Sequence, residues 1–322
     1  MEIFKNNDPW YLNGITGAII PADRCSPHYQ LVTNCNRLGP IEYGHSIHSA
    51  KAKVAYNTVN INEKAFVAGF EIELQPKTKQ LIYDLHHGKA FKSNWLFLRR
   101  DKTLDYGGVE FVSIPLPVNY LTDKELYGIT EQFKNLGLEP NKSCGFHIHV
   151  DHNYLTGFRT DANHYHIPMQ LAAIELHQLY YSLSDKFLTA LFGRKCNSYC
   201  RSIKTLGPNK HELNLMYDFA KRFGKHSVWP SCYHIYPNGG HYAELDLAGN
   251  GNAFTFEFRR GASTLDSERL FAMMDFVHQI CKYIRYENIF FDGPDKTYAR
   301  FTKKLKTKSR SELLTKLAEK YL

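Results

Sequence analysis

Hydrophobic and polar positions alternate with a period of two in several short stretches, which predicts β-strands with one apolar and one polar face. We expect strands over Phe66–Leu74, Trp95–Leu98, Val109–Ile114, Gly145–Asp151 and Phe254–Arg259. Between them, apolar positions spaced three or four residues apart predict amphipathic helices. Strands scattered among helices without regular alternation favour an α+β fold over a doubly wound parallel sheet.

The predicted helices are bounded by ordinary start and stop residues. Thr122 should cap a helix that runs through Leu136 and ends at Gly137, and a single long helix is expected over Pro168–Phe192. Two further helices and a capping box complete the prediction: Lys210–Phe223, Asp266–Tyr286, and Ser309 with Glu312 at the start of the last helix.

The chain divides by composition near residue 65. Residues 1–65 are rich in Asn, Pro, Gly and His and predict an N-terminal extension with irregular structure and short strands, followed by a main domain over residues 66–322. Within the extension, Cys25, Cys35, His45 and His48 offer four zinc-ligand side chains. The spacing of the two cysteines is wider than in common zinc sites, so ordinary buried Cys and surface His is the favoured interpretation.

Composition excludes several classes of protein. Hydrophobic residues form 43% and charged residues 22% of the chain, which argues against disorder. The net charge of +8 suits anionic partners such as nucleotides. Part of the excess lies in a predicted solvated segment, so nucleic acid is not expected; its basic residues are Lys303, Lys304, Lys306, Lys308 and Arg310. The odd number of cysteines, seven, favours a reduced, cytoplasmic protein with mostly free thiols. We expect no membrane partner, because no apolar run has the length of a signal peptide or of a membrane span.

Four of the predicted strands carry an unusual set of polar residues on one face. Bulk-solvated faces usually carry Lys, Thr, Ser and Gln, whereas these positions are Glu71, Glu73, Glu110, His147, His149, Glu257 and Arg259. If the strands are neighbours in one sheet, their carboxylates repel one another unless protons or cations compensate. Each motif alone is more often an ordinary sheet face, but together they favour a metal site. Carboxylate oxygens with one or two imidazoles suit Mg²⁺ or Mn²⁺ better than zinc.

These motifs resemble those of the glutamine synthetase and γ-glutamylcysteine ligase superfamily. Gly69–Glu73 resembles its first-strand motif, Cys144–His149 its Gly-x-His-x-His strand, and Phe256–Arg259 its late Glu-x-Arg strand. Asp101–Leu104 followed by Gly108–Ser113 is similar to a subgroup of amidoligases often found in phages and mobile elements. Arg194, Tyr199 and Cys200 resemble that subgroup's Arg and Tyr-Cys positions, and the resemblance covers roughly residues 65–286.

The resemblance implies an open, half-barrel antiparallel sheet with helices on its apolar face, and two divalent metals that grip the phosphates of ATP. By this resemblance Glu73 and Glu110 serve one metal, and Glu71, His147 and Glu257 serve the other. Arg259 would contact the transferred phosphate. The residues assigned to chemistry are Glu110, Glu257 and Arg259, and those assigned to nucleotide binding are Asp101, Arg194, Arg201 and Arg259.

The implied activity is ATP-dependent joining of a carboxylate to an amine through an acyl phosphate. The substrates could be an amino acid, a small amine, a peptide or a protein side chain. A metal-dependent amide hydrolase is the second hypothesis, although it would normally use more His ligands. A degenerate ligase fold with a binding or structural role is the third, and it predicts a broken site.

Two positions depart from the resemblance or invite another interpretation. The subgroup commonly has Asn in the strand before Glu-x-Arg, where this chain has Tyr242–Leu247 with Asp246 as the candidate replacement. Cys144 adjoins the His-x-His strand, where a small buried residue is a better interpretation than a nucleophile.

Overall fold

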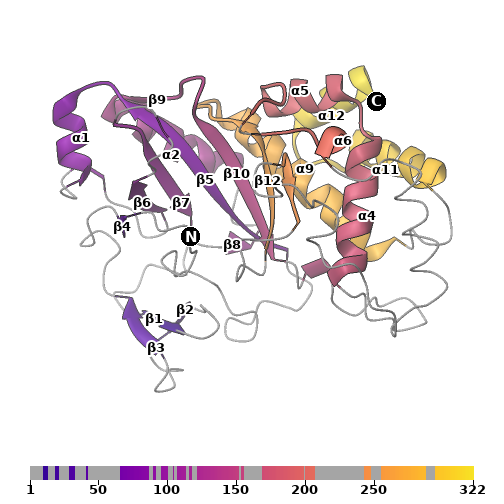
Figure 1. The fold of residues 1–322 in the computed structure, drawn as a ribbon, viewed down its shortest axis with the longest axis horizontal. Helices are drawn as coiled ribbons and strands as arrows, with labels where there is room; N and C mark the ends of the chain where they lie inside the picture. The colour runs from indigo at the N-terminus through magenta and orange to yellow at the C-terminus, as the bar shows by residue number, and fades with distance from the viewer. Residues whose placement is uncertain are drawn as a thin grey trace. The chain divides into compact units, whose positions relative to one another are not determined.

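The computed structural model describes residues 10–13, 19–21, 29–32, 41–42, 66–86, 90–91, 96–100, 104, 107–113, 116–117, 122–151, 154–155, 169–198, 200–206, 243–247, 255–287 and 294–322. Over these residues the fold is α+β, with an open, largely antiparallel sheet and helices (Figure 1). The chain forms two compact units. The first comprises Met1–His147, Asn250–Ala253 and Ala262–Ser267, and the second Ile148–Gly249, Phe254–Gly261 and Glu268–Leu322.

A small antiparallel sheet lies in the N-terminal region. It contains β1 (Trp10–Asn13), β2 (Ile19–Pro21) and β3 (Tyr29–Val32) in the order β2-β1-β3. The four residues considered as a zinc site, Cys25, Cys35, His45 and His48, lie outside the described residues.

The main strands of the first unit surround β5 (Val67–Pro76). β7 (Val109–Ser113) pairs with β5, and β6 (Leu96–Arg100) pairs with β7, both antiparallel. β4 (Ile41–Glu42) adds to β6 in parallel. The short strands β8 (Leu116–Pro117) and β9 (Leu138–Glu139) also pair with β5. The predicted strands that begin near residues 66, 95 and 109 are therefore confirmed within two residues at each end.

Two helices accompany these strands (Figure 1). α1 (Lys79–His86) follows β5 directly, and α2 (Asp123–Leu136) has the bounds that its cap residues predict. Gly137 ends α2 with φ of 79°, a left-handed conformation that glycine adopts without a Cβ clash. The Phe133 ring of α2 lies 4.5 Å from the Phe111 ring of β7, so the apolar face of this strand is covered by the helix.

The strand β10 (Gly145–Asp151) contributes its first three residues to the first unit and the rest to the second. In the second unit the strand order is β11-β12-β10, with β11 (Leu245–Asp246) antiparallel to β12 (Thr255–Ala262). Both longer strands were expected, and β12 continues three residues beyond the predicted end at Arg259.

The helices of the second unit meet around one phenylalanine. Phe276, on α9 (Ser267–Tyr286), is completely buried. Its ring lies 5.7 to 6.4 Å from four other aromatic rings, those of Tyr180, Phe187, Phe192 and Phe301. These rings belong to α4 (Met169–Ser182), α5 (Asp185–Phe192) and α11 (Pro294–Lys308), and a short helix α6 (Ile203–Leu206) lies next to α4.

The expected single helix over Pro168–Phe192 is wrong. The chain forms α4 and α5, separated at Leu183 and Ser184. The Ser184 hydroxyl accepts a hydrogen bond from the Phe187 amide at 3.1 Å, so it starts a new helix. The apolar spacing continues across the break, which is why periodicity alone did not reveal it.

The predicted capping box at Ser309 is also wrong by two residues. Ser309 donates back to the Leu305 carbonyl at the end of α11, and Ser311 caps α12 (Glu312–Tyr321) by accepting from Leu314 N at 3.2 Å. The helix expected over Lys210–Phe223 lies outside the described residues. None of the helices that the structure describes has the length and apolar character that crossing a membrane requires.

Candidate functional site

The polar face of β5 carries two carboxylates in the first unit. The side chains of Phe70, Ile72 and Leu74 alternate with Glu71 and Glu73, and these three apolar residues are at most 2% exposed. Glu71 is partly exposed, but Glu73 is only 6% exposed. The face that carries the carboxylates is therefore itself largely withdrawn from water, unlike an ordinary solvated sheet face.

A third carboxylate stands directly across the strand pair. Glu110 of β7 is the register partner of Glu73 and is 2% exposed. Directly opposed residues in an antiparallel pair have Cβ atoms about 4.5–5.5 Å apart, so two ionised carboxylates here destabilise the fold. Burial strengthens that repulsion because it removes the screening water. A proton or a cation bound between them would relieve it.

An imidazole from β10 completes this group. His147 Nδ1 lies 3.4 Å from Glu71 Oε2, and His147 Nε2 lies 4.0 Å from Glu73 Oε1. Each ring nitrogen thus faces a different carboxylate of β5. The four side chains, Glu71, Glu73, Glu110 and His147, are called the acidic face below.

Gly145 lets the His147 and Glu73 side chains lie close to its backbone. Its backbone N–H donates to Glu73 Oε2. A Cβ atom at this position would lie 2.6 Å from His147 Nε2, so the imidazole would have to move, and 3.2 Å from Glu73 Oε2, which is a tight contact. The glycine of the Gly-x-His-x-His pattern therefore favours the close approach of two candidate ligands to its backbone.

The donor set of the acidic face fits a hard divalent cation. Three carboxylates and one imidazole present mainly oxygen ligands, which Mg²⁺ and Mn²⁺ prefer. The net negative charge of the buried carboxylates would be offset by such an ion. Four of the five residues expected to bind metal, Glu71, Glu73, Glu110 and His147, thus lie together in the first unit.

The fifth expected ligand, Glu257, belongs to the second unit. There His149 Nε2 lies 3.8 Å from Glu257 Oε1, and Arg259 Nη1 donates to the same carboxylate oxygen. Asp246 of β11 is the register partner of Glu257 and is 2% exposed. A charged guanidinium, an imidazole and two carboxylates therefore belong to neighbouring positions of β10, β12 and β11.

Arg194 supports β12 through the backbone of that strand. Its Nη2 donates to the Arg259 carbonyl at 2.9 Å, and its Nε donates to the Arg260 carbonyl at 3.1 Å. The planar guanidinium thus donates hydrogen bonds to two consecutive backbone carbonyls. These two bonds fix the backbone that carries Arg259, a contact that the predicted nucleotide-binding role of Arg194 did not include.

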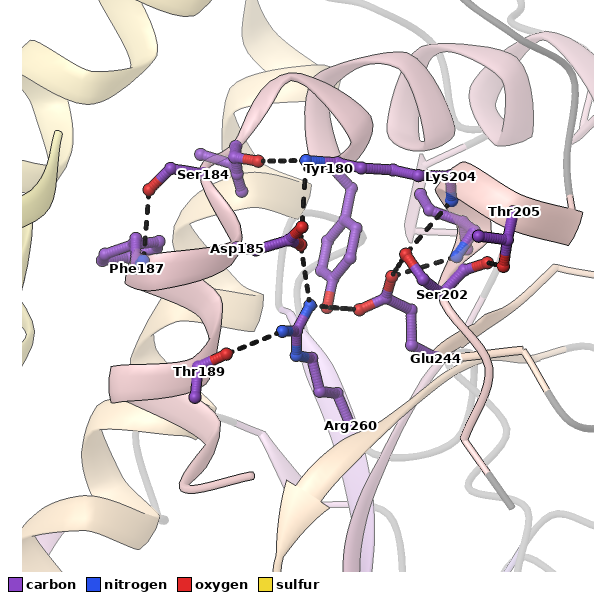
Figure 2. Close-up of polar contacts among 12 residues, drawn as sticks. Tyr180, Ser184, Asp185, Phe187, Thr189, Ser202, Lys204, Thr205, Glu244 and Arg260 are labelled. Atoms are coloured by element: carbon purple, nitrogen blue, oxygen red, sulfur yellow. Dashed lines mark hydrogen bonds and ion pairs between the residues drawn. The ribbon is translucent and has the colours of Figure 1, made fainter. Parts of the chain in front are cut away.

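A buried polar network centres on Arg260 and Glu244 (Figure 2). Arg260 Nη1 and Glu244 Oε2 form an ion pair at 2.6 Å, and their side chains are 2% and 1% exposed. The Ser202 hydroxyl and the Ile203 amide donate to Glu244 Oε1 at 2.9 and 3.0 Å. Burial raises the pKa of the Tyr180 hydroxyl well above its ordinary value, so this group stays protonated and donates to Glu244 Oε2 at 3.3 Å.

The remaining predicted residues are only partly placed. Asp101 lies outside the described residues, and so does Tyr199. Arg201 is exposed, and its carbonyl accepts from the Glu244 amide at 2.8 Å. Cys144 is 1% exposed, as expected for a small buried residue.

The sequence placed His149 on the same polar strand face as His147 but gave it no role of its own. Sequence reasoning did not select two residues that the structure brings together, Glu244 and Arg260. Glu244 and Arg260 lie on segments whose contact depends on tertiary packing, and nothing in their local pattern marks them.

Comparison with protein-family models gives no match for this chain, and comparison with curated proteins gives none either. The fold and the two groups of residues define an α+β protein with a buried acidic strand face. Its activity is therefore argued from the residues themselves.

Proposed function

We propose that the chain is an ATP-dependent carboxylate–amine ligase that uses divalent metal ions. The observation that carries the proposal is the acidic face, where Glu73 and Glu110 are opposed and buried while His147 lies beside both Glu71 and Glu73. Buried carboxylates that lie close together destabilise a fold. Such an arrangement is therefore typical of a site where a bound cation compensates their charges.

The chemistry of amide formation explains why these residue types are needed. A carboxylate is a poor acylating agent, because its leaving group would be oxide. Transfer of the γ-phosphate of ATP to the carboxylate gives an acyl phosphate, and the amine then attacks its carbonyl carbon and expels inorganic phosphate. Bound divalent ions would neutralise the charge of the phosphate oxygens.

The protein side chains have separate roles in this proposal. Glu71, Glu73, Glu110 and His147 would hold the cation, with Gly145 leaving room for the imidazole. In the second unit, Arg259 would bind the oxygens of the transferred phosphate through its planar guanidinium. Glu257 accepts from Arg259 and restricts its orientation, and Arg194 fixes the backbone carbonyl of the same residue. Phosphoryl transfer depends mainly on such positioning and charge neutralisation.

Thermal unfolding with and without Mg²⁺ and ATP tests the proposal. A ligand at 100 times its dissociation constant adds about 2.7 kcal/mol to the free energy of unfolding, which should raise the melting temperature by several degrees. Glu73→Gln keeps the shape of the side chain but removes one charge, so the magnesium-dependent rise should be lost.

The matched control is Glu131→Gln on α2, because Glu131 is partly exposed and pairs only with nearby Lys134 among the ion pairs of the described residues. This variant should respond to Mg²⁺ and ATP as the unaltered chain does. A melting temperature that nucleotide leaves unchanged in the unaltered protein would refute the proposal. An equal rise in Glu73→Gln would remove the acidic face from nucleotide binding.

The second imidazole gives one observation in favour of an amide hydrolase. His149 lies 3.8 Å from Glu257, and hydrolytic metal sites commonly use several His ligands. The same melting measurement, repeated with a transition-metal ion in place of Mg²⁺, separates the two activities. A hydrolase would be stabilised by a transition-metal ion alone with no further gain from ATP, whereas the ligase requires both components for the full rise.

A further inference from the structure

Helix α11 of the second unit carries an unbalanced positive charge. Six of its 15 residues are Lys or Arg, and Asp295 is its one acidic residue. Lys304 forms an ion pair with Glu287, which directly follows α9, and this pair offsets one of the positive charges. The helix therefore keeps a net positive charge, and the effect of that charge depends on where the cations lie.

The buried side of α11 is fixed to α9 along its whole length. Near the start of α11, the Tyr283 hydroxyl donates to the Thr297 carbonyl at 3.2 Å, and the Phe301 ring lies 5.3 Å from the Tyr283 ring. At the end of α11, Gln279 Nε2 donates to the Lys308 carbonyl at 3.2 Å. Because α9 holds both ends and the middle, α11 is a firm support for the side chains on its other side.

The outward side of α11 is lined by cations. Phe301 is 1% exposed, whereas Lys296, Arg300 and Lys303 are exposed. These three cations lie four and three residues apart, a spacing that places side chains on one face of a helix. Lys306, which is partly exposed, continues the row three residues further. The four side chains, Lys296, Arg300, Lys303 and Lys306, are called the basic face below.

The length of the basic face suits a short stretch of a nucleic-acid duplex. Lys296 and Lys306 are separated by about 15 Å along the helix axis, because each residue of an α-helix rises 1.5 Å. A duplex carries one negative charge per about 1.7 Å of its axis, so the same length presents about nine phosphates. Each of the four cations can therefore meet a phosphate.

Two other anionic partners fit the basic face less well. An amphipathic helix binds a membrane through its apolar side, and the apolar side of α11 is already packed against α9. Protein interfaces are enriched in aromatic anchors and depleted of Lys, whereas the exposed residues over 296–308 are Lys, Arg, Ala and Thr. Contacts to phosphates need only cationic side chains.

We propose that the basic face binds the phosphate backbone of duplex nucleic acid without reading its base sequence. The sequence alone favoured a solvated basic segment, because a run of Lys does not show on which side of a helix each charge lies. In the structure four of these cations share the outward side of one helix. The binding does not rest on the proposed ligase activity, since it needs neither ATP nor a metal ion and is measured without them.

Fluorescence polarisation of a labelled DNA duplex, titrated with the full chain at several salt concentrations, tests the proposal. Four phosphate contacts give a slope of about −3.6 for the logarithm of the association constant against the logarithm of the salt concentration. The affinity should therefore fall by about 150-fold between about 50 and 200 mM salt. A second duplex of unrelated sequence should bind with the same affinity.

Removal of three charges from the basic face should weaken the salt dependence. In the triple variant Lys296→Gln, Lys303→Gln and Lys306→Gln, the slope should become less steep by about 2.7, because three phosphate contacts are lost. Gln has nearly the helix propensity of Lys, so α11 should still form. Circular dichroism of the variant verifies its helix content.

The matched control removes the same charge from other helices. It is the triple variant Lys79→Gln, Lys124→Gln and Lys186→Gln, whose positions are exposed on α1, α2 and α5. The control should keep the slope of the unaltered chain, because these lysines lie outside the basic face.

Three results would overturn the proposal. The first is a lack of duplex binding by the unaltered chain at low salt. The second is an equal change of slope in the two triple variants, which would show that net charge alone attracts the duplex. The third is tighter binding of the unaltered chain to a labelled poly-glutamate peptide of equal charge than to the duplex, which would indicate an acidic protein as the partner.

Discussion

Arg260 on β12 forms an ion pair at 2.6 Å with Glu244, the residue just before β11. Both side chains are almost completely removed from solvent. Thr189 accepts from Arg260 Nη2 at 3.0 Å, and Ser202 donates to Glu244 at 2.9 Å, so both charged groups have further polar contacts. Such a pair contributes little net stability by itself, but loss of Glu244 leaves the buried Arg260 guanidinium facing only the exposed Asp185 carboxylate, at 3.5 Å, among the ion pairs of the described residues.

Glu244→Gln should therefore lower the free energy of unfolding by about 3–5 kcal/mol, because Arg260 stays buried and charged. Chemical denaturation measured by far-UV circular dichroism provides the value. The control is Lys316→Ala on α12, whose ion pair with Glu312 is exposed and i,i+4 spaced. That exposed pair should contribute little to the free energy of unfolding, because solvent screens it. Equal losses in the two variants would contradict the importance of the buried pair.

If the proposed function is correct, Gly145→Ala should impair metal-dependent nucleotide binding while leaving the chain folded. The added Cβ would displace His147 Nε2, which lies 2.6 Å from its position, and would crowd the Glu73 carboxylate. The measurement is the rise in melting temperature with Mg²⁺ and ATP. Gly128→Ala on α2 is the control, because a Cβ there meets nothing within 4 Å, and it should stabilise the helix by about 1 kcal/mol.

Arg194→Lys should destabilise the second unit, because one ammonium group cannot donate to both the Arg259 and Arg260 carbonyls in the geometry of a guanidinium. A loss of about 1.5–3 kcal/mol is expected from hydrogen bonds to a charged donor. Arg269→Lys serves as the comparison, since Arg269 contacts the Ala190 carbonyl through Nη1 at 2.7 Å, a contact that a single nitrogen can make. A smaller loss of unfolding free energy in Arg194→Lys than in Arg269→Lys would show that the two hydrogen bonds of Arg194 do not stabilise this unit.

Stability should fall as the pH is lowered below neutrality because of His177. Burial lowers the pKa of this imidazole from its ordinary 6.5 to about 3 in the folded protein. Between these two values the unfolded chain binds a proton that the folded chain does not, so the free energy of unfolding decreases with falling pH. The slope is at most about 1.4 kcal/mol per pH unit for this group.

The measurement is chemical denaturation at pH 7 and pH 5, compared with His177→Leu. The substitution should reduce the difference in unfolding free energy between the two pH values. It should not abolish that difference, because burial also lowers the pKa of His278 to about 4 and gives an effect of the same sign. An unchanged pH dependence in His177→Leu would show that His177 is protonated without penalty in the folded chain.

The strand faces of the candidate site could be predicted from the sequence, because the alternation of side chains along a strand is local. Glu71 and Glu73 needed only their own strand, and the neighbouring β7 and β10 then brought Glu110 and His147 to them. The contact between Glu244 and Arg260 was not predictable in the same way. It depends on the path of the chain between strands, which residue spacing does not encode.

The two boundary errors have a related cause. At Ser184 and Ser311 the helix start is determined by which hydroxyl reaches a free backbone amide, and several nearby serines are equivalent in the sequence. Only the folded backbone selects one of them. The apolar stripe across Ser184 is continuous, so it predicts burial correctly while giving no information about the break between α4 and α5.

The opposed, buried pair of Glu73 and Glu110 also bears on how this chain would respond to directed evolution. Replacing either carboxylate by its amide removes a repulsion, so a laboratory screen that rewards heat resistance alone should enrich such neutral variants. Sequences recovered from that screen would encode proteins with higher melting temperatures that lack the acidic face. If the proposed cation site is correct, a selection scheme must therefore require cation binding together with heat resistance.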